Sequence, residues 1–256
     1  MKIATWNVNS LNVRLPHLER WLADVQPDIV ALQETKLPDE RFPRAEIEAM
    51  GYHVAFNGQK TYNGVAIVSR EPLVDVVTDP PNLTDPQRRI LAATIGGVRV
   101  IDLYVVNGKA VGDEKYEYKL DWLRRVRDFV ADELSRHDKL IVLGDFNIAP
   151  DDRDVHDPEA WRDKILCSPP ERDALKALTD LGLADSFRLL NEEAGQYSWW
   201  DYRQAGFRRN RGLRIDLILV SDALKASVKA VDIDREPRTW ERPSDHTPAI
   251  LELESP

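Results

Sequence analysis

Residues 139–147, KLIVLGDFN, decide the fold class of this chain. Their middle is an apolar run of strand length, and the stretch ends in two polar residues, Asp145 and Asn147. A short apolar run that is bounded in this way is typical of a buried strand. We therefore predict a strand here whose end carries polar side chains to one edge of the core.

Further apolar runs of strand length occur on both sides of this stretch. The runs at 90–95 and 98–106 are separated by Gly96-Gly97, which is a hairpin signal. The run IVALQET at 29–35 is typical of another buried strand. The remaining predicted strands lie at 2–9, 64–70, 214–221, 228–234 and 249–254.

Helical patterns alternate with these strands, whereas the charged, proline-containing segment 151–170 is predicted to be a long loop. Strands that can pair as hairpins coexist with helices in both halves, which favours packed sheets with helices outside over a doubly wound parallel sheet.

The length fits a single domain over 1–256. The sequence contains no GxGxxG and no P-loop, so no nucleotide cofactor is expected. The amphipathic helices are predicted at 15–25, about 116–135 and 171–183.

Composition gives expectations about the cellular location of the protein and about its ligands. No apolar run approaches the length of a membrane span, and the first residues are typical of a strand rather than a signal peptide. The one cysteine, Cys167, allows no internal disulfide, so we expect a cytoplasmic location. The net charge of −9 argues against non-specific nucleic-acid binding unless a local surface is basic.

Polar residues follow or begin five of the predicted strands. Any one of them is most simply explained as a turn residue, but the set is unusual because all the endings are of the same kind. If the strands reach one edge of a sandwich, these side chains meet there. Carboxylates with amides and one histidine suit a hard divalent ion such as Mg²⁺ or Mn²⁺. The set comprises Asn7, Asn9, Glu34, Asp145, Asn147, Asp216, Asp245 and His246.

A basic segment at 202–214 supplies the local positive charge. Five arginines lie there with no acidic residue, and aromatic residues are interleaved with them and precede them. Arginine forks grip phosphates and aromatic faces pack on sugars or bases, although such loops are more often ordinary surface. The arginines are Arg203, Arg208, Arg209, Arg211 and Arg214.

The chain resembles the exonuclease III family of AP endonucleases, within the endonuclease/exonuclease/phosphatase superfamily. The motifs that carry this resemblance run in the family's order from Trp6 to Pro248. The resemblance implies an α/β four-layer sandwich, two packed mixed β-sheets flanked by helices, with a metal site at one edge. The matching stretches are WNVNSLNVRL, LQETK, GVAIVSR, QRRI, LYVVNG, GDFNIAP, SWWDYR, NRGLRIDLIL and SDHTP.

The resemblance also implies a function, namely a divalent-metal-dependent DNA phosphodiesterase of base excision repair. Such an enzyme incises 5′ of abasic sites and removes 3′ nucleotides or 3′ blocking groups. The implied partner is double-stranded DNA with abasic sites or 3′ ends, and the protein is expected to act as a monomer. Glu34 is expected to bind the metal, with Asn7 and Asp245 beside it.

The other catalytic roles follow from the same resemblance. Asp145 is expected to position or deprotonate the attacking water, and Asn147 to orient that water or to hold a phosphate oxygen. His246 is expected to contact the phosphate, with its tautomer fixed by Asp216. Tyr104 is expected to contact the phosphate and to be one candidate for protonating the leaving group.

The expected DNA contacts include a pocket for a base-free sugar. Trp199, Leu213 and Ile215 occupy its positions, and Arg203 lies near it. An apolar pocket of this kind accepts an abasic deoxyribose and excludes a normal nucleotide. The remaining expected DNA contacts are Asn107, Lys36, Arg88 and Arg209.

Two alternatives use the same fold. A phosphoinositide phosphatase or a sphingomyelinase would keep the metal but change the substrate, although relatives of that kind have different loops at the SWW and RID positions. A non-catalytic regulator that binds nucleic acid would need no intact site. This second alternative is disfavoured because the chain retains the full catalytic set, namely Glu34, Asp145, Asp216, Asp245 and His246.

Overall fold

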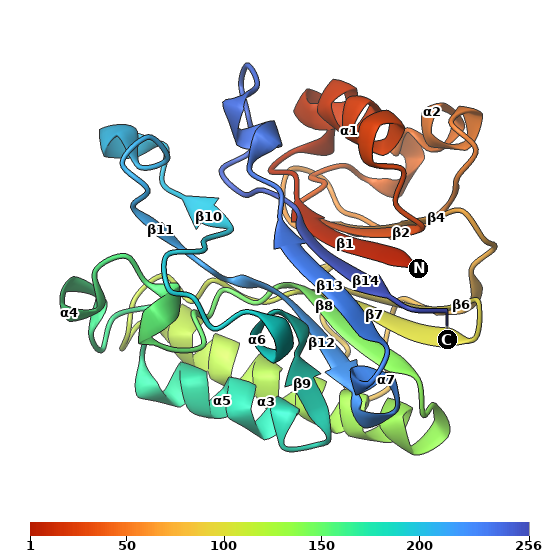
Figure 1. Ribbon diagram of the computed structural model, residues 1–256. Coiled ribbons are helices and arrows are strands. Elements are labelled where there is room, and N and C mark those ends of the chain that lie inside the picture. The colour runs from red at the N-terminus through yellow and green to blue at the C-terminus, as the bar shows by residue number, and fades with distance from the viewer. Residues whose placement is uncertain (256) are drawn as a thin grey trace.

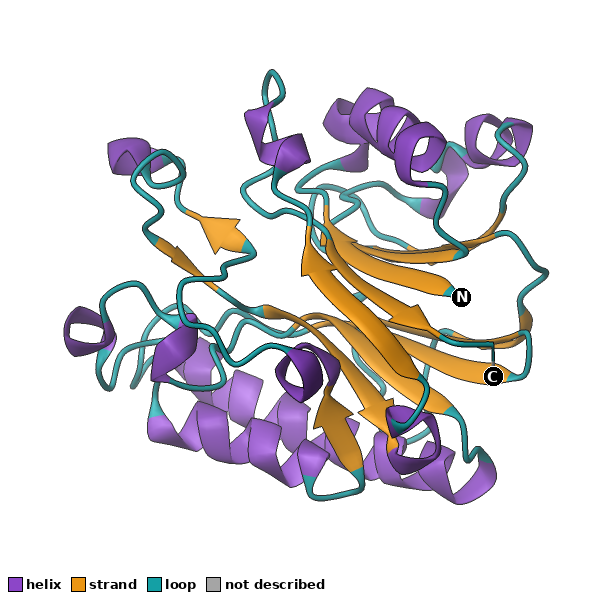
Figure 2. Cartoon of the chain, in the orientation of Figure 1, coloured by secondary structure: helices purple, strands orange, loops and turns teal. Residues whose placement is uncertain are grey.

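Two six-stranded mixed sheets face each other in the computed structural model, which describes residues 1–255 (Figures 1 and 2). The first sheet has the order β13 (Val228–Ile233), β14 (Ala249–Leu253), β1 (Lys2–Asn7), β2 (Ile29–Gln33), β4 (Val65–Ser69), β3 (His53–Asn57). The second has the order β5 (Val74–Val77), β6 (Ile90–Ile95), β7 (Val98–Tyr104), β8 (Leu140–Asp145), β12 (Asp216–Ser221), β9 (Leu183–Asp185).

Helices cover the outer faces of both sheets. Figure 1 shows α1 (Leu11–Val25) and α2 (Arg44–Ala49) over the first sheet, and α3 (Glu114–Arg136) and α5 (Pro169–Thr179) over the second. A separate ribbon of two short strands projects beside them. The smaller elements are α4 (Pro158–Trp161), α6 (Ser186–Leu190), β10 (Trp199–Trp200), β11 (Gly212–Leu213), α7 (Asp222–Lys225) and 3₁₀ turns at Asp39–Arg41, Asp152–Asp154, Arg203–Ala205 and Glu236–Thr239.

Three apolar layers separate the four layers of secondary structure. Strand β1 sends Ile3 between the sheets and Trp6 toward α1, while β8 sends Leu143 between the sheets and Val142 toward α3. Both faces of these strands are therefore buried, which explains why their sequences are continuous apolar runs instead of alternating ones. The predicted four-layer α/β sandwich is confirmed.

Strand directions bring the polar strand ends together. In the first sheet β1 runs parallel to β2 and antiparallel to β14. In the second, β7 runs parallel to β8, and β12 runs antiparallel to β8 with Asp216 opposite Asp145. Because β1 packs against β8 and β12, the ends of β1, β2, β7 and β8 and the starts of β12 and β14 lie at one edge of the sandwich.

Some elements differ from the sequence-based expectation. The helix expected from residue 15 begins at Leu11, and the segment 151–170 contains a 3₁₀ turn, α4 and the first residues of α5 rather than loop alone. Strands β3 and β5 were not predicted, and β5 is an exposed edge strand with a register shift. Among the described residues, no helix is long and apolar enough to cross a membrane.

Candidate active site

Three acidic or imidazole side chains meet at this edge of the two sheets. Glu34 follows β2, Asp145 ends β8, and His246 lies just before β14. One ligand atom from each lies within 4.8 Å of the others. The carboxylate oxygens of Glu34 and Asp145 are the donors that a hard divalent ion prefers, and Glu34 leaves part of the site open to solvent. The residues present therefore fit a divalent metal ion.

Asn7 joins the two carboxylates of this cluster. Its Nδ2 donates to Glu34 Oε1 and to Asp145 Oδ2, at 2.9 Å in both cases, and its Oδ1 accepts from the backbone N–H of Asn9 at 3.0 Å. The amide thus orients both carboxylates toward a common point. Direct ligation of a metal by Asn7 stays a prediction.

His246 is held by a buried carboxylate. Its Nδ1 lies 2.8 Å from Asp216 Oδ2, and its Nε2 lies 3.6 Å from Asp145 Oδ2. Burial alone would lower the pKa of His246, but the Asp216 and Asp145 carboxylates outweigh burial and raise it well above the ordinary value. The imidazole is therefore suited to remain protonated and to face a negative phosphate.

Burial also changes the acidity of Asp145. Loss of water raises the pKa of its carboxyl to about 7, with Asp216 adding to the effect while the charge of His246 opposes it. A carboxyl whose pKa lies near neutrality is suited to accept a proton during catalysis. The role of Asp145 as the base stays a prediction.

Tyr104 ends β7 opposite Asp145 in the parallel pairing of β7 with β8. Burial raises the pKa of its phenol well above 10, and the Glu34 and Asp145 carboxylates raise it further. The phenol therefore stays a hydrogen-bond donor. Arg89, which the sequence analysis did not select, lies 4.7 Å from the Tyr104 ring centre and donates to its carbonyl at 3.2 Å.

Two asparagines form the neighbouring part of the site. Asn107 Nδ2 donates to Asn147 Oδ1 at 3.4 Å, and Asn147 Nδ2 donates to the carbonyl of Val105 at 2.9 Å. The backbone of Asn147 has a φ of 48°, and that of Glu34 has a φ of 52°. Non-glycine residues adopt this left-handed conformation infrequently, although asparagine does so more readily than most, and here it turns the chain out of β2 and β8.

The residues expected to form a sugar pocket lie together. Trp199 pairs with Leu213 across the β10–β11 ribbon, and Leu213 and Ile215 belong to one buried apolar cluster on which Trp199 packs. Trp199 Nε1 donates to Asp245 Oδ2 at 3.0 Å. Asp245 therefore joins this cluster to the catalytic residues but lies outside the set formed by Glu34, Asp145 and His246. Its role as a metal ligand stays a prediction.

The expected DNA-contacting cations have different surroundings. Lys36 Nζ lies 3.4 Å from Glu34 Oε2, so it is at the site. Arg203 is highly exposed and forms an ion pair with Asp201, whereas Arg209 is exposed on the same segment. Arg88 forms an ion pair with Asp79, whereas Arg89 contacts Tyr104.

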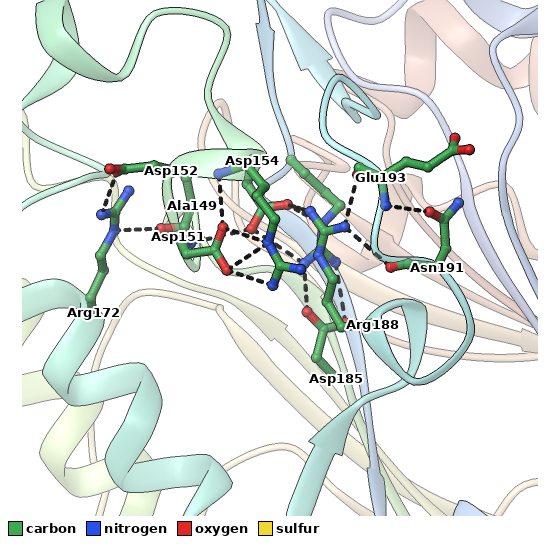
Figure 3. Close-up of polar contacts among 11 residues, drawn as sticks. Ala149, Asp151, Asp152, Asp154, Arg172, Asp185, Arg188, Asn191 and Glu193 are labelled. Carbon is green, nitrogen blue, oxygen red and sulfur yellow. Dashed lines mark hydrogen bonds and ion pairs between the residues drawn. The ribbon is translucent and has the colours of Figure 1, made fainter.

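Arg214 does not belong to the basic surface, contrary to the sequence-based expectation. Its side chain is buried and donates to Asp154 at 2.7 Å and to Asp185 at 2.5 Å. Figure 3 shows the surroundings of Asp154, whose Oδ1 also accepts from Arg188 Nη2 at 2.5 Å. The two carboxylates neutralise the charge of Arg214 inside the protein, so the side chain is not exposed to solvent. It instead fixes the position of the backbone between Leu213 and Ile215.

A cationic cavity next to Asn107 was also missed by sequence reasoning. It measures about 400 Å³ and is lined by Arg89, Lys109, Lys115 and Tyr118. These residues come from three separate segments, and only QRRI was noted in the sequence. The cavity adjoins Asn107 and adds positive charge to that part of the site.

Comparisons with known proteins agree with this geometry. The family model described as the Endonuclease/Exonuclease/phosphatase family matches residues 4–246. The chain is 38% identical to an exodeoxyribonuclease III of Haemophilus influenzae, over 99% of this chain and 100% of that protein. A solved structure of the 3′ phosphatase NExo from Neisseria, bound to a product DNA hairpin, is 54% identical with a TM-score of 0.98. An AP endonuclease from Archaeoglobus fulgidus is 36% identical with a TM-score of 0.96, and all of each chain is covered in both structures.

Proposed function

Because this chain belongs to the endonuclease/exonuclease/phosphatase family and is a DNA repair nuclease of the exodeoxyribonuclease III type, we propose that it hydrolyses phosphate esters at abasic sites and at 3′ ends of duplex DNA. The observation that carries the proposal is the meeting of Glu34, Asp145 and His246, with Asp216 behind the histidine, at one edge of both sheets.

The proposed reaction needs an oriented water, neutralised phosphate charge and a stabilised leaving group. Asp145 accepts the proton of the attacking water, which its pKa of about 7 favours. His246 remains protonated beside Asp216 and donates to a phosphate oxygen. Tyr104 donates from its phenol to the phosphate or to the departing 3′ oxygen.

Glu34, with the Asp145 carboxylate beside it, would hold the divalent ion, whereas the protonated His246 of the same cluster cannot ligate an ion and faces the phosphate instead. When bound, such an ion neutralises phosphate charge and polarises the ester as a Lewis acid. We propose Mg²⁺ or Mn²⁺ because both favour oxygen ligands and open octahedral sites. Asn7 fixes the two carboxylates at the spacing that the site requires.

Two neighbouring surfaces support a DNA substrate. The apolar cluster with Trp199, Leu213 and Ile215 suits a sugar without a base, and the cavity with Arg89 and Lys109 suits the phosphates of the strand. The named activities of the similar proteins, a 3′ phosphatase and an AP endonuclease, support the two substrate classes separately. We further propose that the protein acts as a monomer in the cytoplasm.

Three labelled duplexes test the proposal, one with an internal abasic site, one with a 3′ phosphate at a nick and one with an undamaged recessed 3′ end. The purified protein should cut the first, dephosphorylate the second and shorten the third with added Mg²⁺ or Mn²⁺, and a chelator should stop all three reactions. Turnover of the 3′ substrates without any abasic-site incision would restrict the function to 3′ ends. Failure on all three would refute it.

A further inference from the structure

A lysine with no exposed surface lies directly behind the two asparagines of the site. Lys119 is on α3, and its Nζ donates to the backbone carbonyl of Asn147 at 2.7 Å and to that of Asn107 at 3.2 Å. Its third partner is the carboxylate of Glu171, at the start of α5. All three donors of the ammonium group are therefore used, which is the condition for burying such a charge.

The carboxylate that balances this charge is also fixed on every side. Glu171 is fully buried. Its Oε1 accepts from the N–H of Leu166 at 3.0 Å, and its Oε2 accepts from the N–H of Ser168 at 3.1 Å and its hydroxyl at 2.7 Å. The position of the lysine is thus set by a rigid helix start rather than by solvent.

The two carbonyls belong to loops that follow neighbouring parallel strands. Asn107 lies just after β7, and Asn147 lies just after β8. Gly108 shows how closely the first loop approaches the lysine, because a Cβ there would lie 3.0 Å from Lys119 Cδ and 2.9 Å from Ile165 Cδ1. One ammonium group therefore joins the backbones of the two loops, in addition to the direct bond from Asn147 Nδ2 to the carbonyl of Val105.

We propose that Lys119 is a positioning residue for the reaction: through the backbone carbonyls of Asn107 and Asn147, it sets the spacing of the two amide side chains that hold the phosphate. The proposal rests on the proposed function and on the contact of the Asn107 and Asn147 amides with the phosphate, which the family resemblance implies. The Nζ group directs three tetrahedral donors to three segments, a pattern that neither a planar guanidinium nor an apolar side chain reproduces.

Two variants separate positioning from stability. Lys119→Met leaves the Glu171 charge buried without a counter-charge, so Tm should fall by about 10 °C. Lys119→Met combined with Glu171→Gln removes both charges and should recover most of that Tm. If Lys119 positions the loops, kcat on a 3′-phosphate duplex at 25 °C should be about 100-fold below the wild-type value in both variants, while KM changes little.

The matched control is the other buried ion pair of the same helix. Arg99 Nε donates to Glu133 at 2.7 Å, and both side chains are buried. Arg99 precedes Tyr104 by five strand residues, about 17 Å. Arg99→Met should lower Tm to a similar extent and leave kcat unchanged. An equal loss of kcat in Arg99→Met, or recovery of kcat together with Tm in the double variant, would overturn the proposal.

A readout without turnover keeps this test separate from the proposed function. The side-chain amide NMR signals of Asn107 and Asn147 should shift or broaden in the double variant and remain in place in Arg99→Met. Should the wild type cut no DNA, the proposed function fails, and unchanged amide signals in the double variant would still refute positioning by Lys119.

Discussion

Asp145 contributes to three features of the site at once. It faces His246 and Glu34, it accepts from Asn7, and its Oδ1 accepts from the backbone N–H of Asn147 at 3.0 Å. Substitution by asparagine preserves the shape and the bond from the Asn147 backbone, but it removes the charge and the acceptor for Asn7. The carboxylate is required for accepting a proton, whereas the loop contact can also be made by an amide oxygen.

Asp145→Asn should lower kcat by about 1,000-fold, because an amide cannot act as the base. Affinity for duplex DNA should change by less than about threefold, since the phosphate and sugar contacts come from other residues. Single-turnover cleavage and fluorescence anisotropy on the same duplex measure the two quantities. A parallel loss of binding and turnover would contradict the role of Asp145 as the base.

Asp102 gives a second prediction, on stability. It lies between the sheets, where Gln33 Nε2 donates to its Oδ1 at 2.8 Å. Burial raises its pKa well above 3.8, and the bond from Gln33 only partly opposes this. At pH values above the ordinary pKa, the Asp102 carboxyl is deprotonated in the unfolded chain but still protonated in the folded chain. The contribution of Asp102 to stability therefore falls as pH rises.

Asp102→Asn removes this titration and should therefore stabilise the protein at pH 8, by about 1 kcal/mol in the free energy of unfolding. The gain should shrink as pH falls toward the ordinary pKa, where both states of the wild type carry the proton. Urea unfolding at about pH 8 and about pH 4.5 compares the two proteins. If the free energies of unfolding of the variant and the wild type differ by the same amount at both pH values, Asp102 has the same protonation in the folded and the unfolded chain.

At the scale of elements, the sequence predicts what depends on local pattern. The runs that end at Glu34 and Asp145 are continuous and apolar because both faces of β2 and β8 are covered, and this signal is strong. The burial of Lys119 and Arg214, in contrast, does not depend on local sequence. Their partners lie 52 and 60 residues away, at Glu171 and Asp154, so the sequence around each cation is no guide to its burial.

The β10–β11 ribbon tests the expected sugar pocket. Trp199 packs on Leu213 and Ile215 and also bonds to Asp245, so its loss opens the pocket without removing a catalytic group. Trp199→Ala should lower kcat/KM on abasic duplex about 30-fold but on undamaged 3′ ends by less than about threefold. Trp199→Phe keeps an aromatic ring but not the Asp245 bond, and it should retain most of the abasic activity. Equal losses on both substrates would refute a sugar-specific role.

At the scale of the whole molecule, an acidic protein must bind an acidic polymer. The net charge of −9 repels DNA at long range, so binding relies on a local basic surface. The structure reduces that surface, because Arg214 is internal and Arg203 is paired with Asp201. Arg208, Arg209 and Arg211 remain exposed between β10 and β11, and the cationic cavity beside Asn107 supplies further positive charge.

Salt should therefore weaken binding steeply although the protein is acidic. Each phosphate that a cation neutralises adds about −0.9 to the slope of log affinity against log salt, because counterions leave the DNA. Arg209→Gln should reduce the magnitude of the slope by about 1, whereas Arg127→Gln, the same change on α3 beside Asp128, should leave it unaltered. Anisotropy titrations between about 50 and about 200 mM salt measure the slope. Identical slopes for wild type and Arg209→Gln would place the DNA away from this segment, since net charge alone changes equally in both variants.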